Sequence, residues 1–189
     1  MKLRKTIAVV ASVLIAATSG SVFAASKTLD NVKSRGIVQC VVNPGLTGFA
    51  APDDKGVWKG FDIDLCRSFA AAIFDDPNKT AYKPGTGKTR FTILRSGEAD
   101  VITRNSTWTF VRDVDLGFDF VGVNYYDGQG FMVSKDLGVK SARELDGATV
   151  CIQTGTTTEL NLADYFRTNN MAFQPVPTED SAESQQAGV

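Results

Sequence analysis

The apolar positions in the first half of the chain follow two different periods. The run 37–42 is rich in β-branched residues and predicts a buried strand. Beyond it, Ile63, Cys66, Ala70 and Ile73 recur at the spacing of one helix face. The later elements that we expect in this half are a strand around 81–83, a helix over 91–96 and a strand over 99–102. This order of strands and helices predicts an α/β fold with a parallel sheet covered by helices.

The periodicity breaks at 119–130, where three glycines and two tyrosines occur together. Because glycine-rich stretches interrupt regular structure, we interpret this segment as a crossing into a second lobe. The elements that we expect after it are an apolar strand over 131–133, a short helix capped by Ser141, a strand over 148–152 and a helix that opens at 154–159 and runs to about 169. The chain is therefore expected to hold two α/β units in succession.

The first 24 residues have the pattern of an export signal. Basic residues precede an apolar run at 7–17, and small residues at 22–24 suit a cleavage site. We therefore expect a signal peptide at 1–24 and a mature chain that begins near Ala25 in the periplasm. The apolar run is short for a membrane span, and no later segment approaches about 18 uninterrupted apolar residues.

Charge narrows the class of partner. The chain carries 20 basic and 21 acidic side chains, a net charge of −1. Removing Lys2, Arg4 and Lys5 with the signal leaves 17 basic side chains and a net charge of about −4. Nucleic-acid binding requires a basic face, which this balance does not suggest, so we expect no nucleic-acid partner.

Three cysteines in an exported chain require an explanation, because an oxidising compartment favours disulfides. Cys40 lies in the first predicted strand, and the helical spacing puts Cys66 on the face directed towards that strand. We therefore expect a Cys40–Cys66 disulfide, which would stabilise the chain by about 3–4 kcal/mol for a loop of this length. Cys151 is then either a buried free thiol or the partner of a residue beyond Val189.

A polar stretch at 103–113 directly follows an apolar strand and is the first candidate for a binding site. Arg112 carries a planar fork of donors that can hold a carboxylate with two hydrogen bonds. The neutral hydrogen-bonding residues of the same stretch are Asn105, Thr107 and Thr109. The alternative is a surface loop in which Arg112 only pairs with Asp113 or Asp115.

Two apolar residues after the first strand are candidates for a pocket wall. Leu46 and Phe49 lie on the loop that leaves the C-terminal end of that strand, where open α/β sheets bind their ligands. The stretch 103–113 leaves the same edge of the predicted sheet, so both loops can face one cleft. The alternative is that Leu46 and Phe49 pack under their own loop.

The start of the last expected helix is a third candidate. Gly155 lets a ligand approach the backbone, and the unpaired amides at a helix start can bind an anion. Gly155 and Thr157 could therefore hold a carboxylate from the side opposite Arg112. The alternative is a capping box made by Thr156 and Glu159, and the two uses are compatible.

Two carboxylates, those of Asp62 and Asp64, stand at the start of the first core helix. We expect Asp62 to cap this helix and Asp64 to interact with the positive end of its dipole, because these are the common uses of carboxylates at a helix start. A catalytic pair or a metal site is the alternative.

These motifs together resemble the family 3 periplasmic solute-binding proteins of amino-acid ABC importers. The resemblance rests on GFDIDL at 60–65, TFVR at 109–112, YY at 125–126 and GTT at 155–157. Longer matches resemble the general L-amino-acid-binding components of that family, and they are RNSTWT at 104–109, YYDGQGFMV at 125–133 and TTTELNLADYF at 156–166. The matches extend over essentially the whole mature chain.

The resemblance implies a bilobed periplasmic-binding-protein fold of type II, in which two α/β lobes close on one L-amino acid. The first lobe would occupy 25–122 and the second 131–189, with a hinge crossing at 123–130. The residues that would contact the ligand are Arg112 at its α-carboxylate, Asn105, Thr107 and the Thr157 amide at its backbone atoms, and Leu46 near its side chain.

The resemblance also implies a periplasmic monomer without a cofactor, which delivers L-amino acids to the permease subunits of an ABC importer and catalyses no reaction. In this family the acid that holds the ligand's ammonium group comes later in the second lobe. We therefore expect the chain to be the N-terminal part of a longer binding protein. The alternatives are a periplasmic dehydratase-like enzyme on the same fold and the sensor domain of a receptor.

Overall fold

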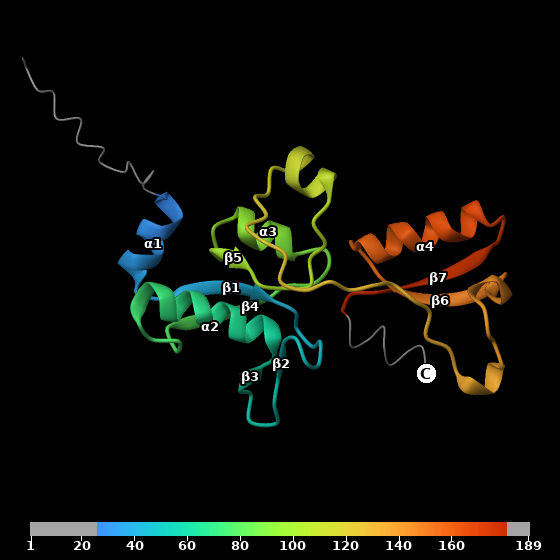
Figure 1. The fold of residues 1–189 in the computed structure, drawn as a ribbon, viewed down its shortest axis with the longest axis horizontal. Coiled ribbons are helices and arrows are strands. Elements are labelled where there is room, and N and C mark those ends of the chain that lie inside the picture. Colours follow the sequence, from blue (N-terminus) through green and yellow to red (C-terminus); the bar gives the residue numbers. More distant parts are fainter. Residues whose placement is uncertain (1–25, 181–189) are drawn as a thin grey trace, which may run out of the picture.

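The structure is a computed structural model that describes residues 26–180, so the predicted signal peptide lies outside it (Figure 1). The elements of the first lobe are α1 (Lys27–Arg35), β1 (Val38–Val42), β2 (Ala51–Pro52), β3 (Trp58–Lys59), α2 (Phe61–Phe74), β4 (Thr80–Pro84), α3 (Arg90–Arg95), β5 (Val101–Ile102) and the π-helical turn η1 (Val111–Asp115). Those of the second lobe are the 3-10 turns η2 (Lys135–Leu137) and η3 (Ala142–Leu145), then β6 (Ala148–Gln153), α4 (Thr157–Thr168) and β7 (Phe173–Thr178). No helix in the described range is long and apolar enough to cross a membrane.

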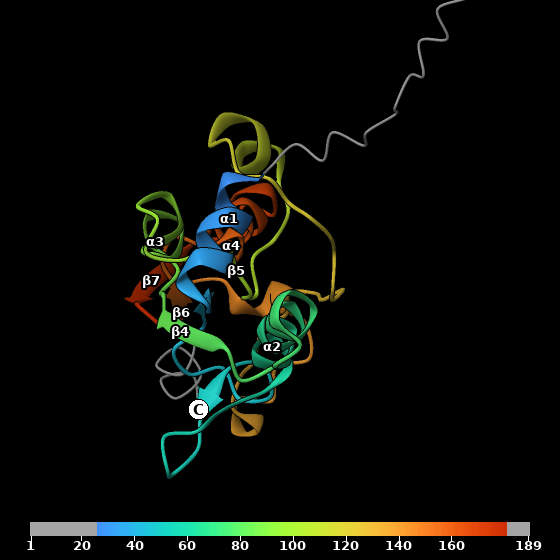
Figure 2. The ribbon, with the colours of Figure 1, turned by 90° about the vertical axis from the view of Figure 1, so that its left-hand side faces the viewer.

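The first lobe is built on a parallel sheet in the order β4-β1-β5. From β1 the chain crosses to β4 on one side, and then passes to β5 on the other side of β1. Because parallel crossovers are right-handed, the two connecting helices must cover opposite faces of the sheet. Figure 2 shows α2 and α3 on opposite sides of β4. The prediction of a parallel sheet covered by helices is confirmed.

Cys40 and Cys66 form a disulfide in the core of the first lobe, as predicted. Their Cα atoms lie 6.2 Å apart, and neither residue is exposed to solvent. Cys40 stands opposite Tyr82 of β4 and Val101 of β5, so the bridge ties α2 to the middle of the sheet. Cys151 is half-buried and belongs to no disulfide of the described residues.

Helix α2 begins differently from the prediction. Its N-cap is Gly60, at a φ of 122°, and no side chain caps it. A Cβ on Gly60 would lie 2.3 Å from the carbonyl oxygen of Phe49, so this close approach requires glycine. The expectation that Asp62 caps the helix is therefore wrong. Asp62 is buried instead, with 2% of its surface exposed.

The second lobe pairs β6 with β7 in parallel, with α4 between them in the chain. Both caps predicted for this lobe are confirmed. Oγ1 of Thr156 accepts a hydrogen bond from the Glu159 amide at 3.1 Å, and Oε2 of Glu159 accepts one from the Gly155 amide at 2.8 Å. Oγ of Ser141 accepts one from the Arg143 amide at the start of η3. Helix α4 is therefore fixed at its start by its own side chains.

The strand predicted over 131–133 is wrong, because this segment pairs with no strand of the described residues. Phe131 packs instead on α4, with its ring centroid 5.7 Å from that of Tyr165 and 6.0 Å from that of Phe166. The apolar pattern of this segment therefore reflects packing against a helix.

The two lobes meet beside the segment 117–134, which runs between them without regular structure (Figure 1). A Cβ on Gly87 would lie 2.3 Å from the carbonyl oxygen of Thr154. Nη2 of Arg90 donates a hydrogen bond to the carbonyl oxygen of Gly155 at 3.2 Å. The first lobe thus contacts the loop that opens α4. The expected lobe boundaries at 123 and 130 fall inside the crossing and stay predictions.

Replacing Cys40 and Cys66 together by alanine should lower the free energy of unfolding by about 3–4 kcal/mol, because the bridge closes a long loop. Urea unfolding of the oxidised protein measures this loss. Cys151→Ala is the control and should change the stability by less than about 1 kcal/mol. Peptide maps that show free thiols at both positions in periplasmic protein would contradict this prediction.

Gly87→Ala should destabilise the chain by about 1–3 kcal/mol, because the added methyl group meets a backbone carbonyl that no rotamer change can move. Gly122→Ala is the matched control, since a Cβ there meets no atom within 4 Å. Thermal unfolding compares the two variants. Equal melting temperatures would mean that the lobes do not meet at Gly87.

Candidate functional site

The candidate site lies at the C-terminal ends of the neighbouring strands β1 and β5. The chain leaves β1 towards one edge of the sheet and reaches β5 at the other edge, and ligands of open α/β sheets bind at such a switch point. The loop 43–59 leaves β1 here, and the stretch 103–113 leaves β5. Together with the crossing they enclose a cavity of about 730 Å³. Both loops therefore line one cavity, as the strand order predicts, and its volume is in the usual range for a small-molecule site.

Apolar and aromatic side chains form one part of the cavity wall. Leu46 and Phe49 both line it, and their contact with a ligand stays a prediction. The ring of Phe49 packs edge-on against Tyr125 of the crossing, with centroids 5.1 Å apart. Trp108 and Phe120 stack on each other at 5.3 Å. The crossing is therefore held over the cavity by contacts between aromatic rings.

Arg104 supplies a buried positive charge to the same cavity. Only 6% of its surface is exposed, and neither Nε nor Nη2 has a hydrogen-bond partner. Burial lowers the pKa of Arg104 to about 10, with Asp62 opposing this shift and Arg112 adding to it. Because a buried charge without partners is costly, these two donors favour an anionic or strongly polar group in the cavity.

Asp62 faces the cavity from the first turn of α2. Its Oδ2 atom is buried without a hydrogen-bond partner. Burial raises the pKa of Asp62 from 3.8 to about 6, and the positive charge of Arg104 opposes this rise. Asp62 and Arg104 interact electrostatically, but no ion pair joins them.

Arg112, the residue predicted to hold a carboxylate, is buried beside the cavity and is not part of its lining. Its Nη1 atom donates to the carbonyl oxygen of Thr107 at 2.8 Å, and its guanidinium lies 5.2 Å from the ring centre of Phe91. Burial lowers its pKa. No ion pair of the described residues joins Arg112 to Asp113 or Asp115. The alternative of a surface arginine that only pairs with one of these aspartates is therefore not observed.

Arg90 completes a group of three buried arginines. It is 1% exposed, its Nη1 atom donates to the carbonyl oxygen of Gly87, and its Nε atom has no partner. Burial lowers its pKa to about 9, and the charges of Arg104 and Arg112 add to this shift. Three guanidinium groups close enough to repel one another, with Asp62 nearby, give this region an excess of positive charge.

The polar candidates around Arg112 fall into two sets. Asn105 and Thr107 line the cavity, whereas Thr109, Gly155 and Thr157 lie outside its lining. The hydroxyl groups of Thr107 and Thr157 are hydrogen-bonded at 3.0 Å, which joins the lobes at the edge of the site. The Gly155 amide already donates to Glu159, and Oγ1 of Thr109 accepts from the Arg112 amide at 3.3 Å.

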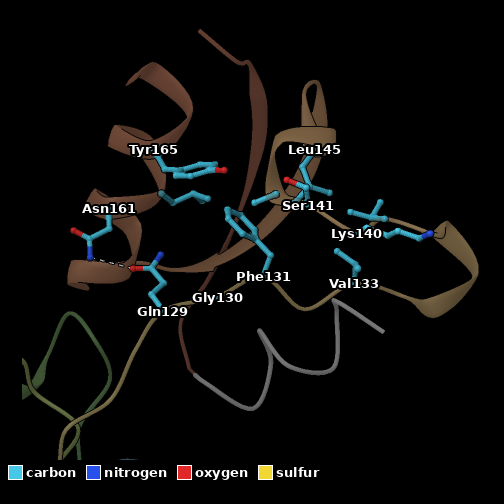
Figure 3. Close-up of a pocket in the computed structure, with 12 residues that line it drawn as sticks. Gln129, Gly130, Phe131, Val133, Lys140, Ser141, Leu145, Asn161 and Tyr165 are labelled. Atoms are coloured by element: carbon cyan, nitrogen blue, oxygen red, sulfur yellow. Dashed lines mark hydrogen bonds between the residues drawn. The ribbon is translucent and has the colours of Figure 1, made fainter. Parts of the chain in front are cut away.

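A second cavity, of about 550 Å³, lies within the second lobe. Figure 3 shows Phe131 between Tyr165 and Leu145, with Gln129 and Asn161 hydrogen-bonded at one end, at 3.1 Å. The charged side chain in its lining is that of Lys140. The first cavity is lined by a buried guanidinium and a buried carboxylate, which this second cavity lacks, so we place the site in the first cavity.

The sequence pattern located the two loops but missed Asp62 and Arg90. Asp62 lies at a helix start, where capping is the common use of a carboxylate, but it also stands four residues before Cys66, on the same stripe as the core-facing residues. That spacing was the available signal that its side chain points inwards. Arg90 carried no such signal, because one of its hydrogen-bond partners, the Gly155 carbonyl oxygen, belongs to the second lobe. Among the described residues, no cluster of His, Cys, Asp or Glu could hold a metal ion.

Two α/β lobes joined by a crossing, with a charged cavity at the edge of the first sheet, define a solute-binding protein of the type II periplasmic fold. The chain belongs to family 3 of the bacterial extracellular solute-binding proteins, and the model of that family matches residues 38–182. The fold and the family expected from the sequence motifs are therefore confirmed.

Two of the relatives are bacterial proteins named for the amino acids that they bind. The chain is 64% identical over 163 residues to the glutamate/glutamine/aspartate/asparagine-binding protein BztA of Rhodobacter capsulatus, which covers 86% of this chain and 48% of BztA. It is 60% identical over 164 residues to the general L-amino acid-binding periplasmic protein AapJ of Rhizobium johnstonii, which covers 87% of this chain and 48% of AapJ.

A solved structure agrees with these relatives. A periplasmic binding protein from Brucella ovis with glutathione bound superposes with a TM-score of 0.82 at 55% identity, over 86% of this chain and 51% of that one. The chain thus spans about half the length of the relatives that it matches.

The raised pKa of Asp62 predicts a pH dependence of stability. Between about pH 4 and pH 6 the folded chain holds a proton on Asp62 that the unfolded chain has released, so stability falls as the pH rises through this window. Asp62→Asn removes this effect, and should raise the melting temperature more at about pH 7.5 than at about pH 4.5. Scanning calorimetry without ligand measures the difference.

Asp64→Asn is the matched control for this experiment, because Asp64 lies in the same helical turn with its side chain exposed. It should leave the shape of the pH profile unchanged. Parallel profiles for the wild type and Asp62→Asn would show that the Asp62 carboxyl titrates as in the unfolded chain.

Proposed function

We propose that the full-length protein binds L-amino acids in the periplasm and delivers them to the permease subunits of an ABC importer. The observation that carries this proposal is the 730 Å³ cavity lined by Arg104, a buried arginine with two unpaired donors whose charge interacts with those of Arg90 and Arg112. A carboxylate offers the charge that this region lacks. The names of BztA and AapJ, as amino-acid-binding proteins, support the same class of ligand.

Arg112 holds the α-carboxylate in this proposal. The Thr107 carbonyl and the Phe91 ring fix its guanidinium in one orientation, so little conformational freedom is lost when a carboxylate binds. Asn105 and Thr107 contact the ligand from the first lobe, and the Thr157 amide approaches from the second. A ligand that enters between the lobes then replaces the hydrogen bond between Thr107 and Thr157.

The ligands that we expect include acidic and amide amino acids, on the strength of the similarity to BztA. The aromatic and aliphatic wall around Phe49 and Leu46 offers room for other side chains, which fits a broad range such as the name of AapJ describes. The volume of the cavity also exceeds the needs of one amino acid, so glutathione belongs among the ligands to be tested.

The protein acts as a monomer and catalyses no reaction in this proposal. The alternative is a dehydratase-like enzyme, for which the 189 residues of this chain offer carboxylates and lysines as acid and base but no histidine. Incubation with prephenate separates the two functions. Release of a dehydrated product would support the enzyme, and protection against melting by amino acids alone supports the binding protein.

The direct test is calorimetric titration of the full-length protein with each L-amino acid and with glutathione. We expect dissociation constants of about 10 μM or lower for several L-amino acids and much weaker binding of their D-isomers. A protein that binds none of them at about 1 mM would refute the proposal.

Arg112→Ala should weaken binding of every amino acid by about 30-fold to several thousand-fold, because it leaves the ligand carboxylate buried without its partner. Arg112→Lys should also bind poorly, since an ammonium group cannot reproduce the two parallel hydrogen bonds of the fork. Arg67→Ala, at a partly exposed arginine of α2, is the control. A loss of less than about threefold in Arg112→Ala would move the carboxylate anchor to Arg104.

A further inference from the structure

Arg104 and Asp62 form a donor and acceptor pair that the proposed α-carboxylate site does not use. Both are more than nine-tenths buried, and both line the 730 Å³ cavity. Nε and Nη2 of Arg104 and Oδ2 of Asp62 are without hydrogen-bond partners. Each side chain lies in the electrostatic field of the other, yet no ion pair joins them, so a small planar group of a ligand can supply the hydrogen bonds that both lack.

Among the charged groups around Asp62, Arg104 has the main electrostatic influence on its carboxyl group. The strands packed against α2 are β1, which carries no charged residue, β3 with Lys59 and β4 with Lys83. Lys59 is already paired with Asp53 at 2.7 Å. On the cavity side stands Asp127 of the crossing, which is exposed. Arg104 is the charged group that acts on Asp62.

We propose that Arg104 and Asp62 bind the carboxylate or carboxamide at the end of the ligand's side chain, an inference that rests on the proposed function. Arg104 donates hydrogen bonds to one oxygen of this group. With glutamine or asparagine, ionised Asp62 accepts a hydrogen bond from the amide nitrogen. With glutamate or aspartate, protonated Asp62 donates its hydrogen to the second carboxylate oxygen.

The proton balance differs between the two kinds of ligand. An amide ligand meets the ionised carboxylate and needs no proton. An acidic ligand brings a second negative charge beside Asp62, so one proton must be taken from solvent and shared between the two carboxyl groups. Burial has already moved the pKa of Asp62 to about 6, so this uptake occurs readily near neutral pH. One site therefore accepts acids and amides of the same length.

Titration calorimetry of the full-length protein tests this proposal without any variant. Heats of binding are measured at about pH 7.5 in buffers with different ionisation enthalpies, for L-glutamate, L-glutamine and L-alanine. We expect uptake of about one proton with glutamate and of none with glutamine or alanine. The ratio of glutamate to glutamine affinity should fall about tenfold for each pH unit between about pH 7 and pH 8.5. Equal proton uptake for glutamate and glutamine would overturn the proposal.

Two variants assign the effect to the pair. Asp62→Asn should still bind glutamate and glutamine, but without proton uptake and with a constant affinity ratio across this pH range. Asp127→Asn is the matched control, because it removes an exposed carboxylate from the same cavity and should keep the uptake. Uptake that persists in Asp62→Asn, or disappears in Asp127→Asn, would overturn the assignment to Asp62.

Arg104→Met, a substitution of similar volume, should weaken glutamate and glutamine by about 30-fold or more and alanine by less than about threefold. An equal loss for all three ligands would make Arg104 an anchor for the α-carboxylate and would overturn the side-chain site while leaving the proposed function intact. If the wild type bound none of the three, the proposed function itself would fail.

Discussion

The burial of three guanidinium groups next to one carboxylate is the constraint on which the binding region depends. Arg90, Arg104 and Arg112 each lose solvation, and each lies in the field of at least one other arginine or of Asp62. Buried charges persist only where partners or a ligand compensate them. Backbone carbonyl oxygens accept from Arg90 and Arg112, whereas two nitrogens of Arg104 have no partner. An anionic group bound beside Arg104 would supply the acceptors that these two nitrogens lack.

The fold brings these groups together because of its strand order. Placing β1 between β4 and β5 sends α2 and α3 to opposite faces, so Asp62 arrives from one face and Arg90 from the other. Arg104 follows β5 at the edge between them. The Cys40–Cys66 bridge fixes α2 to the central strand, which limits how far Asp62 can move from Arg104. Helix α2 thus links the disulfide of the core to the position of the Asp62 charge in the site.

Much of this arrangement could be predicted from sequence, and the failures have physical causes. The sheet, the disulfide and the caps of α4 follow from local periodicity and from side chains that act within a few residues. The prediction for Asp62 is wrong because a carboxylate at a helix start can either cap the helix or be buried. Here the carbonyl oxygens of Gly48 and Phe49, which lie close to Gly60, accept from the first amides of α2, so no side-chain cap is needed. The apolar pattern at 131–133 predicts a strand, but the side chain of Phe131 packs against Phe166 of α4. Arg90 donates a hydrogen bond to Gly155 of the other lobe, a contact that no local pattern encodes.

A crystal structure of the full-length protein with L-glutamine bound tests the central claim most directly. The α-carboxylate should lie within hydrogen-bonding distance of Arg112, and the side-chain amide should lie between Arg104 and Asp62, with the Thr107 and Thr157 hydroxyl groups no longer joined to each other. Glutamine bound in the apolar cavity beside Phe131, or in the first cavity without contact to any of the three arginines, would contradict the claim that buried positive charge selects the ligand.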